Sequence, residues 1–120
     1  MSQQAECGLP RRHRLRKRRE FMFLQRTGTR GKSRCCTVVV RRSTHATFKV
    51  GFTVSKKVGN AVCRNLMKRR LRHIVRTQRG RCEGYEINVI AHPPAAEAEF
   101  TQLERDVWRS FRIATDKLKS

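Results

Sequence analysis

The residues with the clearest chemistry lie in the segment 56–76, where Lys and Arg recur and no acidic residue occurs. Soluble helices normally mix both signs of charge, because i,i+4 ion pairs stabilise them. A helix of a single sign repels itself unless a partner of opposite charge neutralises it. The polyanion that can do so along a whole helix is a phosphate backbone. The segment therefore predicts nucleic-acid binding.

This segment predicts a helix that begins at Asn60, a good N-cap residue, and ends near Thr77. At about 100° per residue, an apolar side and a polar side separate clearly. The apolar side, which we expect to pack, holds Cys63, Met67, Leu71 and Ile74. The polar side, an arc of about 140°, holds Arg64, Asn65, Lys68, Arg69, Arg72 and Arg76.

A second candidate surface comes from the segment 48–55, in which large apolar residues alternate with small or polar ones. Period two predicts a strand whose Phe48, Val50, Phe52 and Val54 face a core. Its other face, beside Val39 and Phe21, predicts a groove for an extended single strand whose bases stack on the aromatic ring. In the alternative interpretation, Phe21 simply packs a first helix against the sheet.

The remaining elements follow from periodicity and from turn residues. Helices are predicted over residues 15–25 and 97–117, the second as structural packing with Trp108 at the edge of its apolar stripe. Strands are predicted over residues 36–40 and 86–91, with a glycine-rich basic loop over 28–34. The order α-β-β-α-β-α predicts a single-domain α+β sandwich with one sheet face packed by helices. Residues 1–12 are expected to form a disordered basic tail, and 13–120 a single RNA-binding domain.

The charge of the chain is unevenly distributed. It has 29 Lys and Arg residues against 9 Asp and Glu residues, a net charge of +20. Residues 1–82 hold 24 basic and 2 acidic residues, whereas residues 83–120 hold 5 basic and 7 acidic residues. This asymmetry indicates a directed basic surface. The sequence has no secretory signal and no apolar segment of membrane-spanning length, so we expect a cytoplasmic location and no membrane partner.

No catalytic or metal site is predicted in the polypeptide. The five cysteines form no C-x-x-C pair and are expected to be reduced and structural. The four histidines are scattered, and no pair of acidic residues is placed to hold a metal ion. Five of the nine acidic residues lie between Glu97 and Asp116, and a solvated helix face accounts for them.

The segment SKKVGNAVCRNLMKRRLR resembles the signature of the bacterial ribonuclease P protein subunit. The basic N-terminus, the pair Glu20-Phe21, the strand ending GFTVSKK and the late strand EINVIAH support the resemblance, which covers about residues 12–115. It implies an endoribonuclease whose catalytic component is RNA, with magnesium held mainly by that RNA. The implied reaction removes the 5′ leader of precursor tRNA, and the implied fold has a left-handed β-α-β crossover.

The resemblance also implies residue roles. The contacts with the RNA subunit would be Arg64, Asn65, Lys68, Arg69 and Arg72. The cleft for the precursor-tRNA leader would involve Phe21, Val39, Thr53, Ser55, Lys56 and Lys57. Two positions depart from the family pattern: Leu66 stands where a third cationic residue is usual, and Gln25 where a second aromatic residue is usual.

Three other functions compete with this interpretation. A ribosomal-type structural protein would bury the basic helix in ribosomal RNA. A DNA-binding helix-turn-helix module is disfavoured because no partner helix directly precedes the basic helix, so DNA is not expected as a partner. An autonomous protein nuclease would cleave without any RNA subunit.

Overall fold

A four-stranded sheet forms the centre of the computed structural model, which describes residues 10–44 and 47–119. The strand order is β1-β2-β4-β3, and β4 pairs antiparallel with β2 and parallel with β3. Strand β3 is therefore an edge strand, and its outer side carries one isolated bridge, between Arg14 and Val50. The strands are Thr29–Lys32 (β1), Cys36–Arg42 (β2), Lys49–Val54 (β3) and Tyr85–Ala91 (β4).

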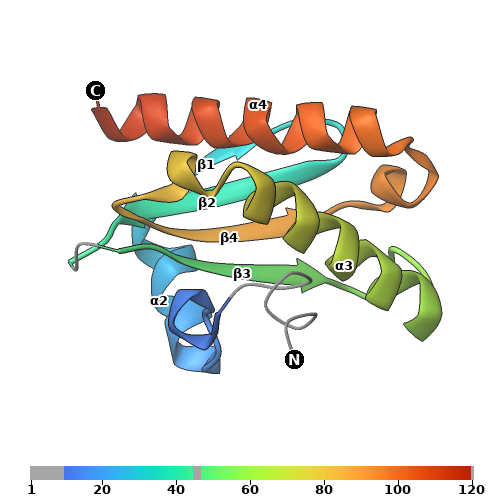
Figure 1. The fold of residues 1–120 in the computed structure, drawn as a ribbon, viewed down its shortest axis with the longest axis horizontal. Helices are drawn as coiled ribbons and strands as arrows, with labels where there is room; N and C mark the ends of the chain where they lie inside the picture. Colours follow the sequence, from blue (N-terminus) through green and yellow to red (C-terminus); the bar gives the residue numbers. More distant parts are fainter. Residues whose placement is uncertain (1–9, 45–46, 120) are drawn as a thin grey trace.

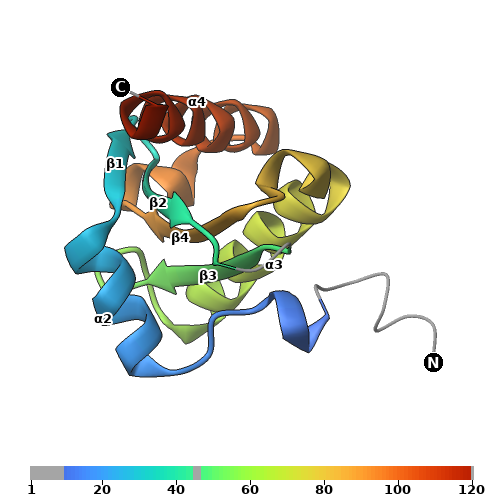
Figure 2. The same cartoon turned by 90° about the vertical axis from the view of Figure 1, so that its left-hand side faces the viewer.

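Three α-helices flank the sheet. Figures 1 and 2 show α3 and α4 on one face and α2 on the other. Their bounds are Arg18–Thr27 (α2), Ala61–Thr77 (α3) and Phe100–Lys119 (α4). Short 3-10 turns lie at Arg11–His13 (η1), Arg79–Cys82 (η2) and Pro93–Glu97 (η3). None of the helices in the described part of the chain is long and apolar enough to span a membrane.

The connection from β3 through α3 to β4 has the unusual hand. In Figure 1 both strands point to the right, β4 lies above β3, and α3 crosses in front of the sheet. This arrangement is a left-handed crossover, whereas parallel strands are nearly always joined by a right-handed one. The crossover implied by the family resemblance is thus confirmed.

The alternation along β3 places its side chains as predicted. Phe48, Val50 and Val54 are buried in the main core between the sheet and helices α3 and α4, and Phe52 packs against it. One part of the prediction for α4 is wrong: Asp106 does not lie on a solvated face, since it is only 4% exposed. Its Oδ2 accepts a hydrogen bond from the Cys35 N–H at 3.1 Å, which ties α4 to the sheet.

Strand β1 is absent from the sequence prediction, which placed a loop over residues 28–34. The strand contains no apolar side chain, so neither periodicity nor β-propensity indicates it. It exists because α4 lies directly against it: a Cβ on Gly31 would collide with the backbone of Ser110 and Ala114. The hydroxyl of Thr29 also donates to the carbonyl oxygen of Ala114 at 2.8 Å.

Two helices begin later than predicted. Helix α2 begins at Arg18 because the Leu15 N–H donates to the Val50 carbonyl at 3.0 Å, which keeps the preceding chain extended beside β3. Helix α4 begins at Phe100 because Pro93–Glu97 forms the turn η3. Most of the predicted tail lies outside the described residues, and its last two residues, Arg11 and Arg12, belong to η1.

Candidate nucleic-acid interface

Helix α3 presents a cationic face that its own sequence creates. The Asn60 side chain accepts a hydrogen bond from the Cys63 N–H at 2.9 Å, which confirms the predicted N-cap. The predicted apolar side packs into the core through Met67, Leu71 and Ile74, but Cys63, predicted on the same side, is exposed in the first turn of the helix. We call the opposite side the α3 face; it consists of Arg64, Asn65, Lys68, Arg69 and Arg72.

No acidic residue of α3 neutralises this face, since the helix contains none. The ion pairs Arg41–Glu86 and Lys49–Glu20 lie on other elements. Asn65 and Arg69 are exposed, and Arg64, Lys68 and Arg72 are half-buried. Cationic side chains at spacings of three and four residues on one side of a helix form a ladder suited to successive phosphates.

The second predicted set lies where β3 meets α2, and its members differ in exposure. Val39 is completely buried beneath α2, so its side chain supports the floor of this surface. Thr53 is half-buried and its hydroxyl donates to Asn88 Oδ1 at 3.1 Å. Ser55, Lys56 and Lys57 are exposed in the turn between β3 and α3.

Phe21 has a packing role whether or not it binds a base. Its ring rests on Gly51 so closely that a Cβ at that position would collide with it. The ring also belongs to the small cluster of Leu15, Leu24 and Val39 that holds α2 on the sheet. Because Phe21 remains half-exposed at the edge of that cluster, both interpretations of this residue stay open.

A pocket of about 120 Å³ at the edge of β3 brings together one residue of the predicted leader cleft, Phe21, and two of the predicted RNA contacts, Lys68 and Arg72. We call it the β3-edge pocket; its lining is Arg14, Leu15, Phe21, Val50, Gly51, Phe52, Lys68 and Arg72. Burial, together with the charge of Arg14, lowers the pKa of Arg72. Like charges that face each other in this way are relieved by an anion placed between them. The Phe21 ring of α2 and the Lys68 and Arg72 side chains of α3 therefore line one pocket.

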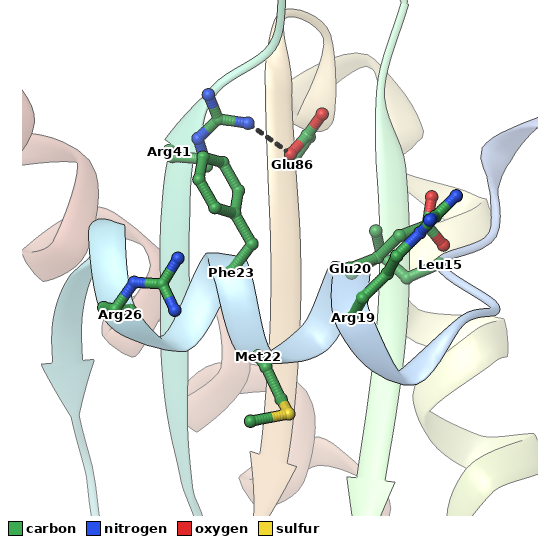
Figure 3. A pocket seen from close by; sticks show the side chains of 8 residues that line it. All are labelled: Leu15, Arg19, Glu20, Met22, Phe23, Arg26, Arg41 and Glu86. Atoms are coloured by element: carbon green, nitrogen blue, oxygen red, sulfur yellow. Dashed lines mark hydrogen bonds and ion pairs between the residues drawn. The ribbon is translucent and has the colours of Figure 1, made fainter.

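The other flank of α2 carries a larger pocket, of about 540 Å³, that the sequence analysis missed (Figure 3). The guanidinium of Arg41 lies 4.7 Å from the ring centre of Phe23 and pairs with Glu86 at 2.7 Å. Phe23 and Met22 are 42% and 53% exposed, which is unusual for large apolar side chains. Phe23 follows Phe21 by two helical positions, and this spacing turns it to the opposite flank.

The histidines of the described chain have structural partners. The ring of His13 stacks on Phe48 at 4.1 Å, and His92 Nε2 lies 2.7 Å from the Thr37 hydroxyl. His73 contacts the ring of Phe100. Among the described residues, no group of three or more His, Cys, Asp or Glu side chains is placed to hold a metal ion.

Comparisons with known proteins agree with this geometry. A family model described as Ribonuclease P matches residues 9–115. The ribonuclease P protein component of Kocuria rhizophila is 52% identical over 99 residues, which cover 82% of this chain and 88% of that protein. The counterpart from Micrococcus luteus is 43% identical and covers 82% of this chain and 84% of its own length.

Solved structures show the same similarity. The RNase P protein of Staphylococcus aureus superposes with a TM-score of 0.79 at 29% identity, covering 85% of this chain and 94% of that one. The RNase P protein of Thermotoga maritima superposes with a TM-score of 0.73 at 28% identity, covering 79% and 91%.

Proposed function

This chain belongs to the ribonuclease P protein family, and on that premise we propose that its α3 face binds the RNA subunit while α2 and β3 hold the 5′ leader of precursor tRNA. The chain is the protein subunit of an endoribonuclease ribonucleoprotein. Its RNA partner carries the chemistry, and the product is the mature 5′ end of the tRNA. We place this assembly in the cytoplasm.

The observation that carries the proposal is the uncompensated charge of α3. Each Lys or Arg that neutralises a phosphate releases condensed counterions, so affinity falls with salt by a logarithmic slope of about 0.7 to 0.9 per contact. The four cations of the α3 face supply several such contacts, and Asn65 adds an amide that both donates and accepts hydrogen bonds.

The leader site is supported by the way the β3-edge pocket joins α2 to α3. An extended RNA strand can stack a base on Phe21 and place its phosphates against Lys56, Lys57 and the N-terminal end of α3. One groove next to the RNA-binding helix lets the protein hold the leader beside the catalytic RNA. Its cations then screen the repulsion between the two polyanions.

Magnesium, which the family implies, does not fit this chain's own residues. The described side chains offer no cluster of ligating groups, and both candidate surfaces are cationic. Carboxylate and water oxygens are the ligands that magnesium prefers. We therefore assign the metal ions to the RNA, and we expect the protein to lower the magnesium concentration that cleavage requires by supplying cations of its own.

The test is reconstitution with a bacterial ribonuclease P RNA. The variant carries Arg64→Gln, Lys68→Gln and Arg72→Gln, which remove three positive charges from the α3 face. We expect the variant to fold but to bind the RNA with a salt slope lower by about two to three. It should also fail to stimulate leader removal at low magnesium. The matched control neutralises Arg34, Arg42 and Lys119, which are exposed and lie outside both surfaces. Equal assembly by the two variants would refute the role of α3.

A second variant in the same experiment tests the leader site. Lys56→Gln with Lys57→Gln should weaken binding of leader-bearing precursor more than binding of mature tRNA, because only the precursor reaches this turn. If both tRNAs lose affinity equally, the leader does not lie between α2 and β3. Co-sedimentation of the chain with ribosomal subunits, without stimulation of cleavage, would favour a ribosomal role instead.

A further inference from the structure

A separate pocket of about 530 Å³ lies between η2 and α4 and shares no residue with the α3 face or the β3-edge pocket. We call it the arginine pocket; its lining is Arg81, Arg105, Trp108, Arg109, Phe111, Arg112 and Thr115. Arg81 comes from η2, and the other three arginines come from successive turns of α4. All four arginines are exposed, so their guanidinium groups are accessible to a ligand.

The charge of this pocket is not balanced by its neighbours. Arg105 donates to the neutral amide of Gln102 at 3.2 Å. Three acidic residues lie near these arginines in the sequence: Glu83 two residues beyond Arg81, Glu104 directly before Arg105, and Asp116 one turn beyond Arg112. Three carboxylates against four guanidinium groups still leave a net positive charge.

Trp108 gives the pocket a second feature that points to a ligand. Its side chain is only 8% exposed, and its buried Nε1 has no hydrogen-bond partner within the described part of the chain. A buried donor without a partner costs about 1–3 kcal/mol, so such groups usually serve a purpose. The guanidinium of Arg81 lies 4.8 Å from the ring centre, which holds one cation in place before any ligand arrives.

We propose that the arginine pocket binds a nucleotide of the RNA subunit as a second contact beyond α3, a proposal that rests on the function proposed above. The planar guanidinium group matches phosphate oxygens in pairs, and the cations of this pocket are all arginines. The volume lies within the range of pockets that hold small ligands, about 300–1,000 Å³. A ligand that displaces the side chains covering Trp108 also gains the N–H of this residue as a donor for a phosphate or base oxygen.

Continuity with the α3 face favours RNA over an acidic peptide as the occupant. Only Gln78 separates the end of α3 from the start of η2, and Figure 1 shows the end of α3 and η2 beneath α4. Exposed Arg79 then lies between the last turn of α3 and Arg81 along the chain. A phosphate backbone that follows α3 toward its C-terminal end thus meets Arg79 and then the arginine pocket.

Trp108 is the only tryptophan of the chain, so the intact protein carries its own probe of this site. The experiment titrates the full chain with bacterial ribonuclease P RNA and records tryptophan emission together with the salt dependence of binding. One variant carries Arg81→Gln, Arg109→Gln and Arg112→Gln. The control carries Arg34→Gln, Arg42→Gln and Lys119→Gln, which removes the same charge from exposed positions outside the pocket. Circular dichroism verifies that both variants fold, and Arg109→Gln alone replaces the triple variant if it does not fold.

We expect RNA to change the emission of the unmodified chain and of the control. The slope of the logarithm of affinity against the logarithm of salt concentration should be smaller by about two in the pocket variant than in the control. With the single substitution the difference should be about 0.7–0.9. Unchanged emission at saturating RNA, or equal slopes in both variants, would overturn the proposal. So would an equal emission change with polyglutamate, since that result identifies an acidic peptide as the ligand.

Failure of this inference and failure of the proposed function give different results. If RNA binding depends on Arg64, Lys68 and Arg72 but ignores the arginine pocket, only this inference fails. If the α3 variant binds RNA as well as the unmodified chain does, the proposed function fails.

Discussion

The α3 face and the arginine pocket both gather cations, yet they are built in different ways. The cations of α3 come from one helix, at spacings of three and four residues, with no acidic residue between them. Those of the arginine pocket come from η2 and from α4, and α4 also carries Glu104, Asp106 and Asp116. A charge count along the sequence detects the first surface and misses the second. Where an anion binds is decided by which side chains converge in space.

The two helices also differ in how the sheet holds them. Helix α4 packs through apolar side chains such as Leu103 and Val107, and polar contacts fix it further. Asp106 accepts from the Cys35 N–H, and the Ser110 hydroxyl donates to that of Ser33 at 2.7 Å. Helix α3 packs through apolar side chains such as Met67 and Leu71. The arginine pocket therefore depends on the position of α4 on the sheet, whereas the α3 face does not.

The largest effect that separates the two surfaces is expected from Gly31→Ala. The added methyl group meets the backbone of Ser110 and Ala114, which cannot move aside without shifting α4. Overpacking of this kind costs about 1–3 kcal/mol, and we expect the upper end because the obstacle is backbone. Urea unfolding measures the loss, and RNA titration should show that the arginine pocket loses its contribution while the α3 face keeps its own.

Gly80→Ala is the matched control for this prediction. A Cβ on Gly80 meets nothing within 4 Å. The free energy of unfolding of the Gly80→Ala variant should therefore stay within about 0.5 kcal/mol of that of the unmodified chain. If Gly31→Ala leaves the free energy of unfolding equally unchanged, the contact with β1 does not fix the position of α4. The distinction between the two helices would then be wrong.

The same distinction explains what the sequence could predict. Strand β3 and helix α3 have clear periodicity, because each turns one apolar side to the common core. Strand β2 was predicted from its run of β-branched residues, which are buried on both faces of the sheet. Strand β1 could not be found, since Thr29–Lys32 has no apolar side chain and is held by α4, which lies far away in the sequence. The cationic residues of α3 were predicted because they share one helix. The arginine pocket was not, because Arg81 joins α4 only in the folded chain.

A smaller effect is expected when α3 gains the cation that the family pattern contains. Leu66 is 46% exposed beside the α3 face, so Leu66→Arg can reach a phosphate without disturbing the core. One further contact should raise the salt slope by about 0.7–0.9 and strengthen RNA binding about fivefold at moderate salt. Thr44→Arg adds the same charge to an exposed position between β2 and β3, outside both cationic surfaces, and it should change neither quantity. Equal gains in both variants would show that net charge, rather than position on α3, governs binding.

The smallest effect is expected from Trp108→Phe, which keeps an aromatic ring beneath Arg81 but removes the unpartnered N–H. If that N–H donates to RNA, its loss should weaken binding about threefold, which corresponds to about 0.6 kcal/mol and lies in the range of one hydrogen bond. The salt slope should not change, because no charge is removed.

The matched control is Tyr85→Phe. It deletes a polar group from a neighbouring ring that packs edge-on against Phe111 and lies outside the pocket lining, and it should leave affinity unaltered. A loss of affinity in Tyr85→Phe equal to that in Trp108→Phe would attribute the effect to packing of the aromatic cluster. The arginine pocket would then hold its ligand by charge alone.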